Sequence, residues 1–487
     1  MGLRKFVLLC FIAILGSGSA VHATGSGYDI KVQIEGVKDS MCYLANYFGD
    51  KQYLQDSIKA DANGNIRFKG DTAWPGGIYL VVMPEKKYFE IILDKDQEFE
   101  LITKFNDPVS AMQIKGSEDN DDFYAYLRFV TAKGQQIQPL RAQHSASSDE
   151  AEKNRLAAEM TRIDQEVKDY RKEYIGQKPN TLLAQLLKVT IDIDIPEPPT
   201  NPDGSVDSTF AYRYYKDHYF DNINLKDDRM VRTPVFHPKI EQYMTKLTPQ
   251  VPDSIIATAD RLIAKLDPES ENFRYVIWWI TNHYETSKYM GMDAVFVHMA
   301  KKYYTLETAY WVDETQLFKI QQRAKVLEPI LLGKQVRNLT LADSANKYQS
   351  LYNVNADYTV LYFWDPDCGH CKKVTPVLKT LYEKVQKDGL QIYAVCTEVE
   401  IDKWKDYIKE NELEWINVAD PELKNNFRYE FDITSTPQIF LLDKDKKILA
   451  KRIEVETLKQ ILEKEMGKEI GDIGSTGAEG DEHQDGH

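Results

Sequence analysis

Two of the five cysteines in this 487-residue chain lie three positions apart, in the stretch FWDPDCGHCKKVTP that begins at Phe363. Cys368 and Cys371 at this spacing suit three roles: a redox-active pair, half of a zinc site, or two buried inert thiols. A structural zinc site needs four ligands, usually from two such pairs. Cys42 and Cys396 are isolated, and no histidine is spaced to complete a set. We therefore interpret the pair as redox-active and predict no metal site.

The residues around the pair predict the elements that must position it. YTVLYFW (358–364) is a continuous apolar run typical of a buried strand, and CKKVTPVLKTLYEKVQ (371–386) has a helical pattern. Cys368 therefore lies at the start of a helix, where unpaired N–H groups and partial positive charge stabilise a thiolate. Cys371 lies about one helical turn further on, so the two sulfur atoms should be neighbours. The position predicts that Cys368 attacks and Cys371 resolves.

The rest of this C-terminal region alternates between strand and helix patterns. LQIYAVC (390–396) predicts a second buried strand, and DKWKDYIKENEL (402–413) predicts an amphipathic helix. PQIFLLD (437–443) and KKILAKRI (446–453) predict two further strands in a hairpin. A strand–helix–strand unit followed by a hairpin indicates a mixed sheet with helices on its faces.

Two regions of different periodicity come before it. Residues 24–116 contain short stretches that alternate apolar and polar residues, separated by turn signals such as Asn63-Gly64, which favours a hairpin. This pattern predicts an antiparallel β-sandwich. Residues 117–330 predict an all-helical region, in which apolar residues recur every three or four positions along 151–176.

The two ends of the sequence and its net charge indicate where in the cell the protein works. Arg4 and Lys5 precede a short apolar run and a stretch of small residues, which is the layout of a secretory signal peptide over residues 1–23. The run is shorter than the ~20 residues that span a bilayer, so we expect no membrane-spanning segment after cleavage. A net charge of −15 argues against binding to nucleic acid. We expect an exported protein of the periplasm or cell envelope, with a disordered tail over 469–487.

Residues 331–468 resemble the thioredoxin fold, and most of all the thiol-disulfide oxidoreductases of bacterial cell envelopes. The Cys-Gly-His-Cys tetrad is similar to that of protein disulfide isomerases, and STPQIFLLDKDKKI matches the loop that holds a cis-proline in this family. The two preceding regions resemble uncharacterised domains that accompany thioredoxin modules in exported proteins. The residues that carry the resemblance are Trp364, Cys368, Gly369, His370, Cys371, Pro376, Thr436 and Pro437.

The resemblance implies thiol-disulfide exchange on protein disulfides or dithiols, with an upstream electron donor or acceptor in the envelope and without a cofactor. It implies that Gly369, His370 and Trp364 support the cysteine pair, with His370 favouring the thiolate. It also implies that Thr436 and Pro437 bind the substrate backbone. The expected protein is thus multidomain, with a sandwich, an all-α region and a C-terminal α/β thioredoxin fold.

Three positions depart from the family pattern. Tyr362 stands where cytosolic thioredoxins have a buried acid, and Val374 where envelope relatives often have a glutamate. Asp367 adds a negative charge next to Cys368. Two alternatives stay open: an envelope binding or scaffold protein whose thioredoxin domain is vestigial, and a thiol-peroxidase-like antioxidant. The peroxidase chemistry usually needs a threonine that DPDCGHC lacks.

Overall fold

The computed structural model describes residues 27–200 and 202–475, so the predicted signal peptide lies outside the described residues. The described chain forms two compact units. The first contains the residues up to 248 together with 261–276, and the second contains 249–260 together with the residues from 277 onward. Among the described helices, we find none with the length and apolar character needed to cross a bilayer.

Two four-stranded sheets form residues 28–115, with strand orders β4-β1-β7-β8 and β3-β2-β5-β6. Apolar residues of β1 such as Ile30 and Val32 are buried and alternate with exposed Lys31 and Gln33, which explains the period of two in the sequence. The β1–β7 pair is parallel, and the other pairs are antiparallel. The strands are β1 (Tyr28–Glu35), β2 (Met41–Phe48), β3 (Lys51–Lys59), β4 (Asn65–Gly70), β5 (Gly77–Val82), β6 (Tyr88–Leu93), β7 (Glu98–Lys104) and β8 (Gln113–Lys115).

The prediction of a hairpin at Asn63-Gly64 was wrong. The turn is present, since Gly64 has φ of +80° and the Asp61 side chain accepts hydrogen bonds from the N–H groups of Asn63 and Asn65. However, β3 and β4 belong to different sheets, so the turn carries the chain from one sheet to the other. A turn signal is local and does not identify the strand that each arm will pair with.

The helical region begins with a long helical hairpin, α1 and α2, and α2 contains the stretch in which apolar residues recur every three or four positions. Ser117 caps α1 by accepting a hydrogen bond from the N–H of Asn120, and Leu156 and Ile163 are buried on the inner side of α2. The helices are α1 (Glu118–Ala146), α2 (Glu150–Gln177), α3 (Leu182–Val189), α4 (Phe210–Asp217), α5 (Phe236–Thr245), α6 (Pro252–Ile263), α7 (Glu271–Glu285), α8 (Asp293–Tyr303) and α9 (Glu314–Leu327).

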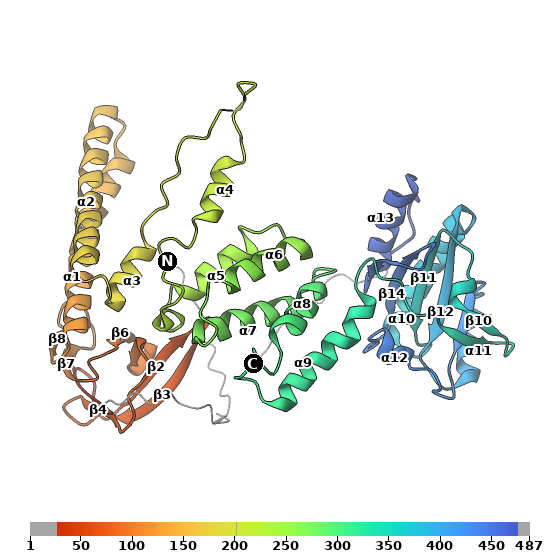
Figure 1. Cartoon of the computed structure of the whole chain (residues 1–487), viewed down its shortest axis with the longest axis horizontal. Coiled ribbons are helices and arrows are strands. Elements are labelled where there is room, and N and C mark those ends of the chain that lie inside the picture. The colour runs from red at the N-terminus through yellow and green to blue at the C-terminus, as the bar shows by residue number, and fades with distance from the viewer. Residues whose placement is uncertain (1–26, 201, 476–487) are drawn as a thin grey trace. The chain divides into compact units, whose positions relative to one another are not determined.

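The C-terminal part of the chain contains a sheet flanked by helices (Figure 1). This sheet is mixed, lies within residues 340–451 and has seven strands in the order β10-β9-β13-β12-β11-β14-β15. β11 pairs in parallel with β12 and antiparallel with β14, and β14 and β15 form a hairpin, so the sheet is mixed as predicted. The elements are β9 (Thr340–Asp343), β10 (Tyr348–Ser350), β11 (Tyr358–Trp364), α10 (Gly369–Val385), β12 (Leu390–Cys396), α11 (Ile401–Glu410), β13 (Ile416–Ala419), α12 (Phe427–Glu430), β14 (Gln438–Asp443), β15 (Ile448–Lys451) and α13 (Val455–Met466).

Both faces of this sheet are covered, which is why β11 reads as a continuous apolar run. Tyr362 and Trp364 belong to the core beneath α10 and α13, while Leu361 and Phe363 belong to the core on the opposite face. Residues of α8 and α9, including Phe296, pack into that second core. The last two helices of the predicted helical region therefore belong to the same compact unit as the sheet.

The packed structure also continues past the predicted start of the disordered tail at 469. Ile470 and Ile473 are 8% and 4% exposed and join the core beneath α10 and α13. The Lys384 ammonium group donates a hydrogen bond to the Asp472 carbonyl. Two isolated isoleucines in a run of glycines and acids give little local signal, and the neighbouring core makes them buried.

Candidate redox site

The strand–turn–helix around the cysteines has the predicted form. β11 ends at Trp364, and Cys368 is the N-cap residue of α10, which begins at Gly369. Cys368 is partly exposed, whereas Cys371 is 1% exposed. All four cysteines in the described part of the chain carry free thiols, so the structure represents the reduced pair.

The helix start favours the thiolate of Cys368. Partial burial raises the pKa of this thiol, but hydrogen bonds to the sulfur lower it by more. The donors are the backbone N–H of Cys371, the Thr436 side chain, the Cys371 thiol and the backbone N–H of His370. The net pKa lies below the ordinary value of a cysteine. This lowering is the effect that the first turn of a helix has on an anion.

The second thiol has the opposite environment. Burial raises the pKa of Cys371 to about 12, and the neighbouring Cys368 adds to the increase. Cys368 is therefore the thiol that ionises more readily, while Cys371 stays protonated near neutral pH. The pair can thus perform a directed exchange, in which one sulfur attacks and the other follows.

The loop that precedes β14 lies against the pair. The Thr436–Pro437 peptide bond is cis, and the Cys368 thiol donates to the Thr436 carbonyl at 3.4 Å. Thr436 and Pro437 are both partly exposed, and Ser435 beside them is exposed. The structure thus brings both predicted substrate-binding residues to the accessible thiol.

The three predicted supporting residues lie in different surroundings. Trp364 is fully buried, and its ring stacks on that of Tyr362 at 6.2 Å between centroids, so it packs beneath the motif. Gly369 is exposed, and a side chain there would meet no other atom within 4 Å. His370 is also exposed, and it is the backbone N–H of His370 that lowers the pKa of Cys368.

Two contacts of the site are absent from the sequence prediction. Lys403 on α11 forms an ion pair with Asp367 at 2.9 Å, which lowers the pKa of that carboxyl group and offsets its charge beside Cys368. The Tyr362 hydroxyl hydrogen-bonds with Thr375 on α10 at 2.9 Å. Neither pair has a characteristic spacing in the sequence, because each forms between elements that meet only in the fold.

The other two cysteines in the described residues are not bonded to the pair. Cys396 ends β12, where it is paired in register with Trp364, and burial raises its pKa to about 12. Cys42 is buried in β2, in the other compact unit. Within residues 27–200 and 202–475, we find no cluster of three histidine, cysteine or acidic side chains arranged to hold a metal ion.

Comparison with known families divides the chain into three matched segments. Residues 355–448 match the family model described as thioredoxin-like. Residues 28–123 and 147–328 match models of two domains of unknown function, DUF4369 and DUF5106.

Two solved structures are similar to parts of the chain. A domain of a possible thiol-disulfide isomerase from Cytophaga hutchinsonii is 39% identical, with 28% of this chain and 95% of that chain covered and a TM-score of 0.27. A thioredoxin-like protein from Bacteroides caccae is 19% identical, with 56% of this chain and 99% of that chain covered and a TM-score of 0.41.

Two curated relatives match the C-terminal region. The thiol-disulfide oxidoreductase ResA of Bacillus cereus is 30% identical over 135 residues, which cover 28% of this chain and 76% of that protein. A thioredoxin-like protein of Haemophilus influenzae is 30% identical over 121 residues, which cover 24% of this chain and 67% of that protein. This chain therefore belongs to the thioredoxin-like thiol-disulfide oxidoreductases and carries two domains of unknown function ahead of its oxidoreductase domain.

Proposed function

We propose that this protein exchanges disulfides with protein substrates through Cys368 and Cys371. The observation that carries the proposal is the contrast within the pair: Cys368 is accessible with a lowered pKa, and Cys371 is buried with a raised one. The Cys368 thiolate attacks a substrate disulfide and releases one substrate thiolate. Cys371 then attacks Cys368 Sγ, releases the second substrate thiolate and leaves a 368–371 disulfide. The reverse sequence oxidises a substrate dithiol.

The surroundings of Cys368 suit a polypeptide substrate. Gly369 and His370 are exposed beside it, and Thr436 and Pro437 border it from the opposite loop. The absence of a side chain at 369 leaves room for an extended segment to approach the sulfur. We propose that the 436–437 loop binds the backbone of that segment and that a separate redox protein resets the pair after each cycle.

We also propose that the protein works in the cell envelope. The expected signal peptide over residues 1–23 supports export. The acidic net charge of −15 argues against a nucleic-acid partner. Oxidising compartments are where proteins that carry disulfides are found, so substrates for exchange are available there.

The trapping of substrates tests the proposed function. Cys371→Ala removes the resolving thiol but keeps the attacking one, so the mixed disulfide should persist and accumulate as adducts that a reductant releases. Cys368→Ala should form far fewer adducts, and Cys396→Ala, which removes a different buried cysteine, should behave like the wild-type protein. If Cys371→Ala is abundant and folded but forms no more adducts than Cys368→Ala, the exchange function is refuted.

A further inference from the structure

A buried hydroxyl pair lies directly beneath the resolving cysteine. Tyr362 on β11 is 0% exposed, and its hydroxyl lies 2.9 Å from Oγ1 of Thr375, which is 1% exposed. Cys371 and Thr375 are four residues apart on α10, so both occupy the face of the helix that covers β11. Burial raises the pKa of Tyr362 well above its ordinary value, and the neighbouring Cys371, which belongs to the same core, raises it further.

The buried position of Cys371 creates a requirement for proton transfer. Resolution of a mixed disulfide needs the Cys371 thiolate, and a thiol with a pKa of about 12 is protonated near neutral pH. Its 1% exposure gives water little direct access to the sulfur. A neighbouring group is therefore the route for this proton, and the Tyr362 hydroxyl, which lies in the same core as Cys371, can accept one proton and donate another.

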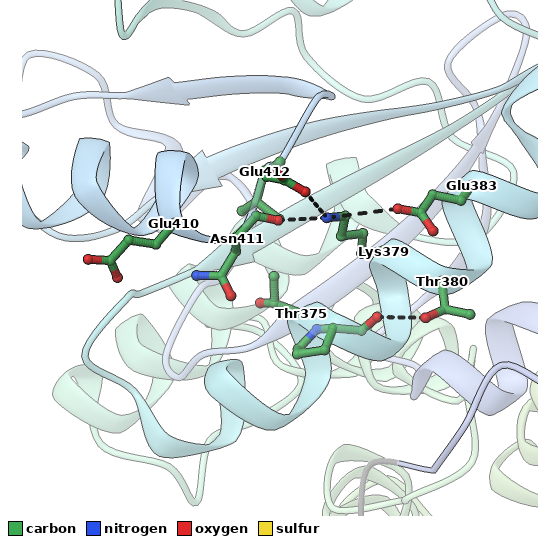
Figure 2. A pocket seen from close by; sticks show the side chains of 9 residues that line it. Thr375, Lys379, Thr380, Glu383, Glu410, Asn411 and Glu412 are labelled. Atoms are coloured by element: carbon green, nitrogen blue, oxygen red, sulfur yellow. Dashed lines mark hydrogen bonds and ion pairs between the residues drawn. The ribbon is translucent and has the colours of Figure 1, made fainter.

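Thr375 also lines a polar pocket of about 390 Å³ between α10 and the end of α11, which Figure 2 shows with its charged side chains. Glu383, Glu410 and Glu412 line the same pocket and are exposed, so water and carboxylate proton acceptors are available there. Lys379 donates to the Asn411 carbonyl at 2.9 Å and holds the two sides of the pocket together.

We propose that Tyr362 and Thr375 relay the proton of Cys371 to this pocket during the resolving step. The Cys371 proton passes to the Tyr362 oxygen, the Tyr362 proton passes to Thr375 Oγ1, and the Thr375 proton passes to water or a pocket carboxylate. The Cys371 thiolate then bonds to Cys368 Sγ and breaks its bond to the substrate sulfur, which leaves as a thiolate. Two electrons reduce the substrate disulfide, and the cysteine pair is oxidised.

This inference rests on the proposed exchange function, and a two-step assay separates the two ideas. Reduced protein is mixed with 5,5′-dithiobis(2-nitrobenzoate) in single-turnover conditions. The first thionitrobenzoate released reports attack by Cys368, and the second reports resolution by Cys371. If the wild-type protein releases neither, the exchange function itself fails. If it releases both, the two phases measure attack and resolution separately in each variant.

Tyr362→Phe and Thr375→Val each remove one hydroxyl with little change in shape. Both should slow the second release by about a hundredfold, the lower end of what positioned proton transfer contributes, and leave the first unchanged. Thr375→Ser keeps a hydroxyl and should restore the second release. Tyr382→Phe is the matched control, because this hydroxyl lies on the same helix but bonds to Gln391. A second release at the wild-type rate in Thr375→Val would overturn the relay, whether or not Tyr362→Phe folds.

Discussion

Sγ of Cys368 lies 3.4 Å from the carbonyl oxygen of Thr436, although the two residues are 68 positions apart in the chain. The register of the sheet brings them together. β11 and β14 are antiparallel neighbours with Phe363 opposite Gln438, so the loop that leaves β11 and the loop that enters β14 lie at the same edge. The accessible thiol is therefore placed beside the second loop, for which we propose a role in substrate binding.

The two thiols should differ sharply in reactivity at pH 7. Cys371 has a pKa of about 12, which leaves about one thiolate in 10⁵ at that pH, whereas the lowered pKa of Cys368 gives it a far larger thiolate fraction. Brief alkylation with iodoacetamide and peptide mapping should find label on Cys368 first. As pH rises, the midpoint of Cys368 labelling should lie below the ordinary cysteine pKa. Earlier labelling of Cys371 would reverse the assigned roles.

Loss of the Lys403 ammonium group should slow the alkylation of Cys368 near neutral pH. Lys403→Ala leaves the Asp367 carboxylate without its ion-pair partner beside Cys368, so the pKa of Cys368 should rise. Asp367→Asn should shift it in the opposite direction. The pH dependence of alkylation measures both shifts, which should shrink in high salt because the pair is exposed. Identical profiles for both variants and the wild-type protein would show that Asp367 has no influence on Cys368.

The buried ion pair between Lys451 of β15 and Asp293 of α8 should be important for stability. The Lys451 side chain is 4% exposed, and its ammonium group also donates to the Ile330 carbonyl at 2.6 Å. Asp293→Ala leaves a buried charge without its partner and should lower the free energy of unfolding by about 3–5 kcal/mol. Urea denaturation measures this change.

The exposed pair Lys301–Glu328 provides the control for that measurement. Lys301→Ala should change the free energy of unfolding by about 0–1 kcal/mol, because both side chains are largely in water. If Asp293→Ala costs no more than this control, the contact between α8 and β15 does not contribute to the stability of the unit.

Truncation of the C-terminus should locate the true end of the packed domain. A chain that ends at Lys468 lacks the buried side chains of Ile470 and Ile473, which should cost about 3–6 kcal/mol of unfolding free energy at the usual value of a buried isoleucine. A chain that ends at Ser475 keeps both and should unfold like the full chain. Equal stability of the two truncated proteins would contradict the packing of this segment.

The sequence by itself determined the local structure around the cysteine pair. An apolar strand followed by Cys-x-x-Cys at a helix start is a short-range pattern. β11 ends at Trp364 and α10 begins directly after Cys368, as this pattern predicts. The alternating residues of β1 and the apolar seam of α2 predicted their elements in the same way. Such patterns predict structure because secondary-structure propensity and the periodicity of buried positions involve residues that are close together along the chain.

Only the tertiary structure decided which distant residues meet. Three features involve segments that no sequence period links. They are the contact of Lys403 with Asp367, the hydroxyl pair beneath Cys371 and the packing of Ile473 into the core. The turn at Asn63-Gly64 likewise formed as predicted but joined two sheets. Side chains on different elements are brought together by sheet register and core packing, and these depend on the whole fold instead of on any one stretch of sequence.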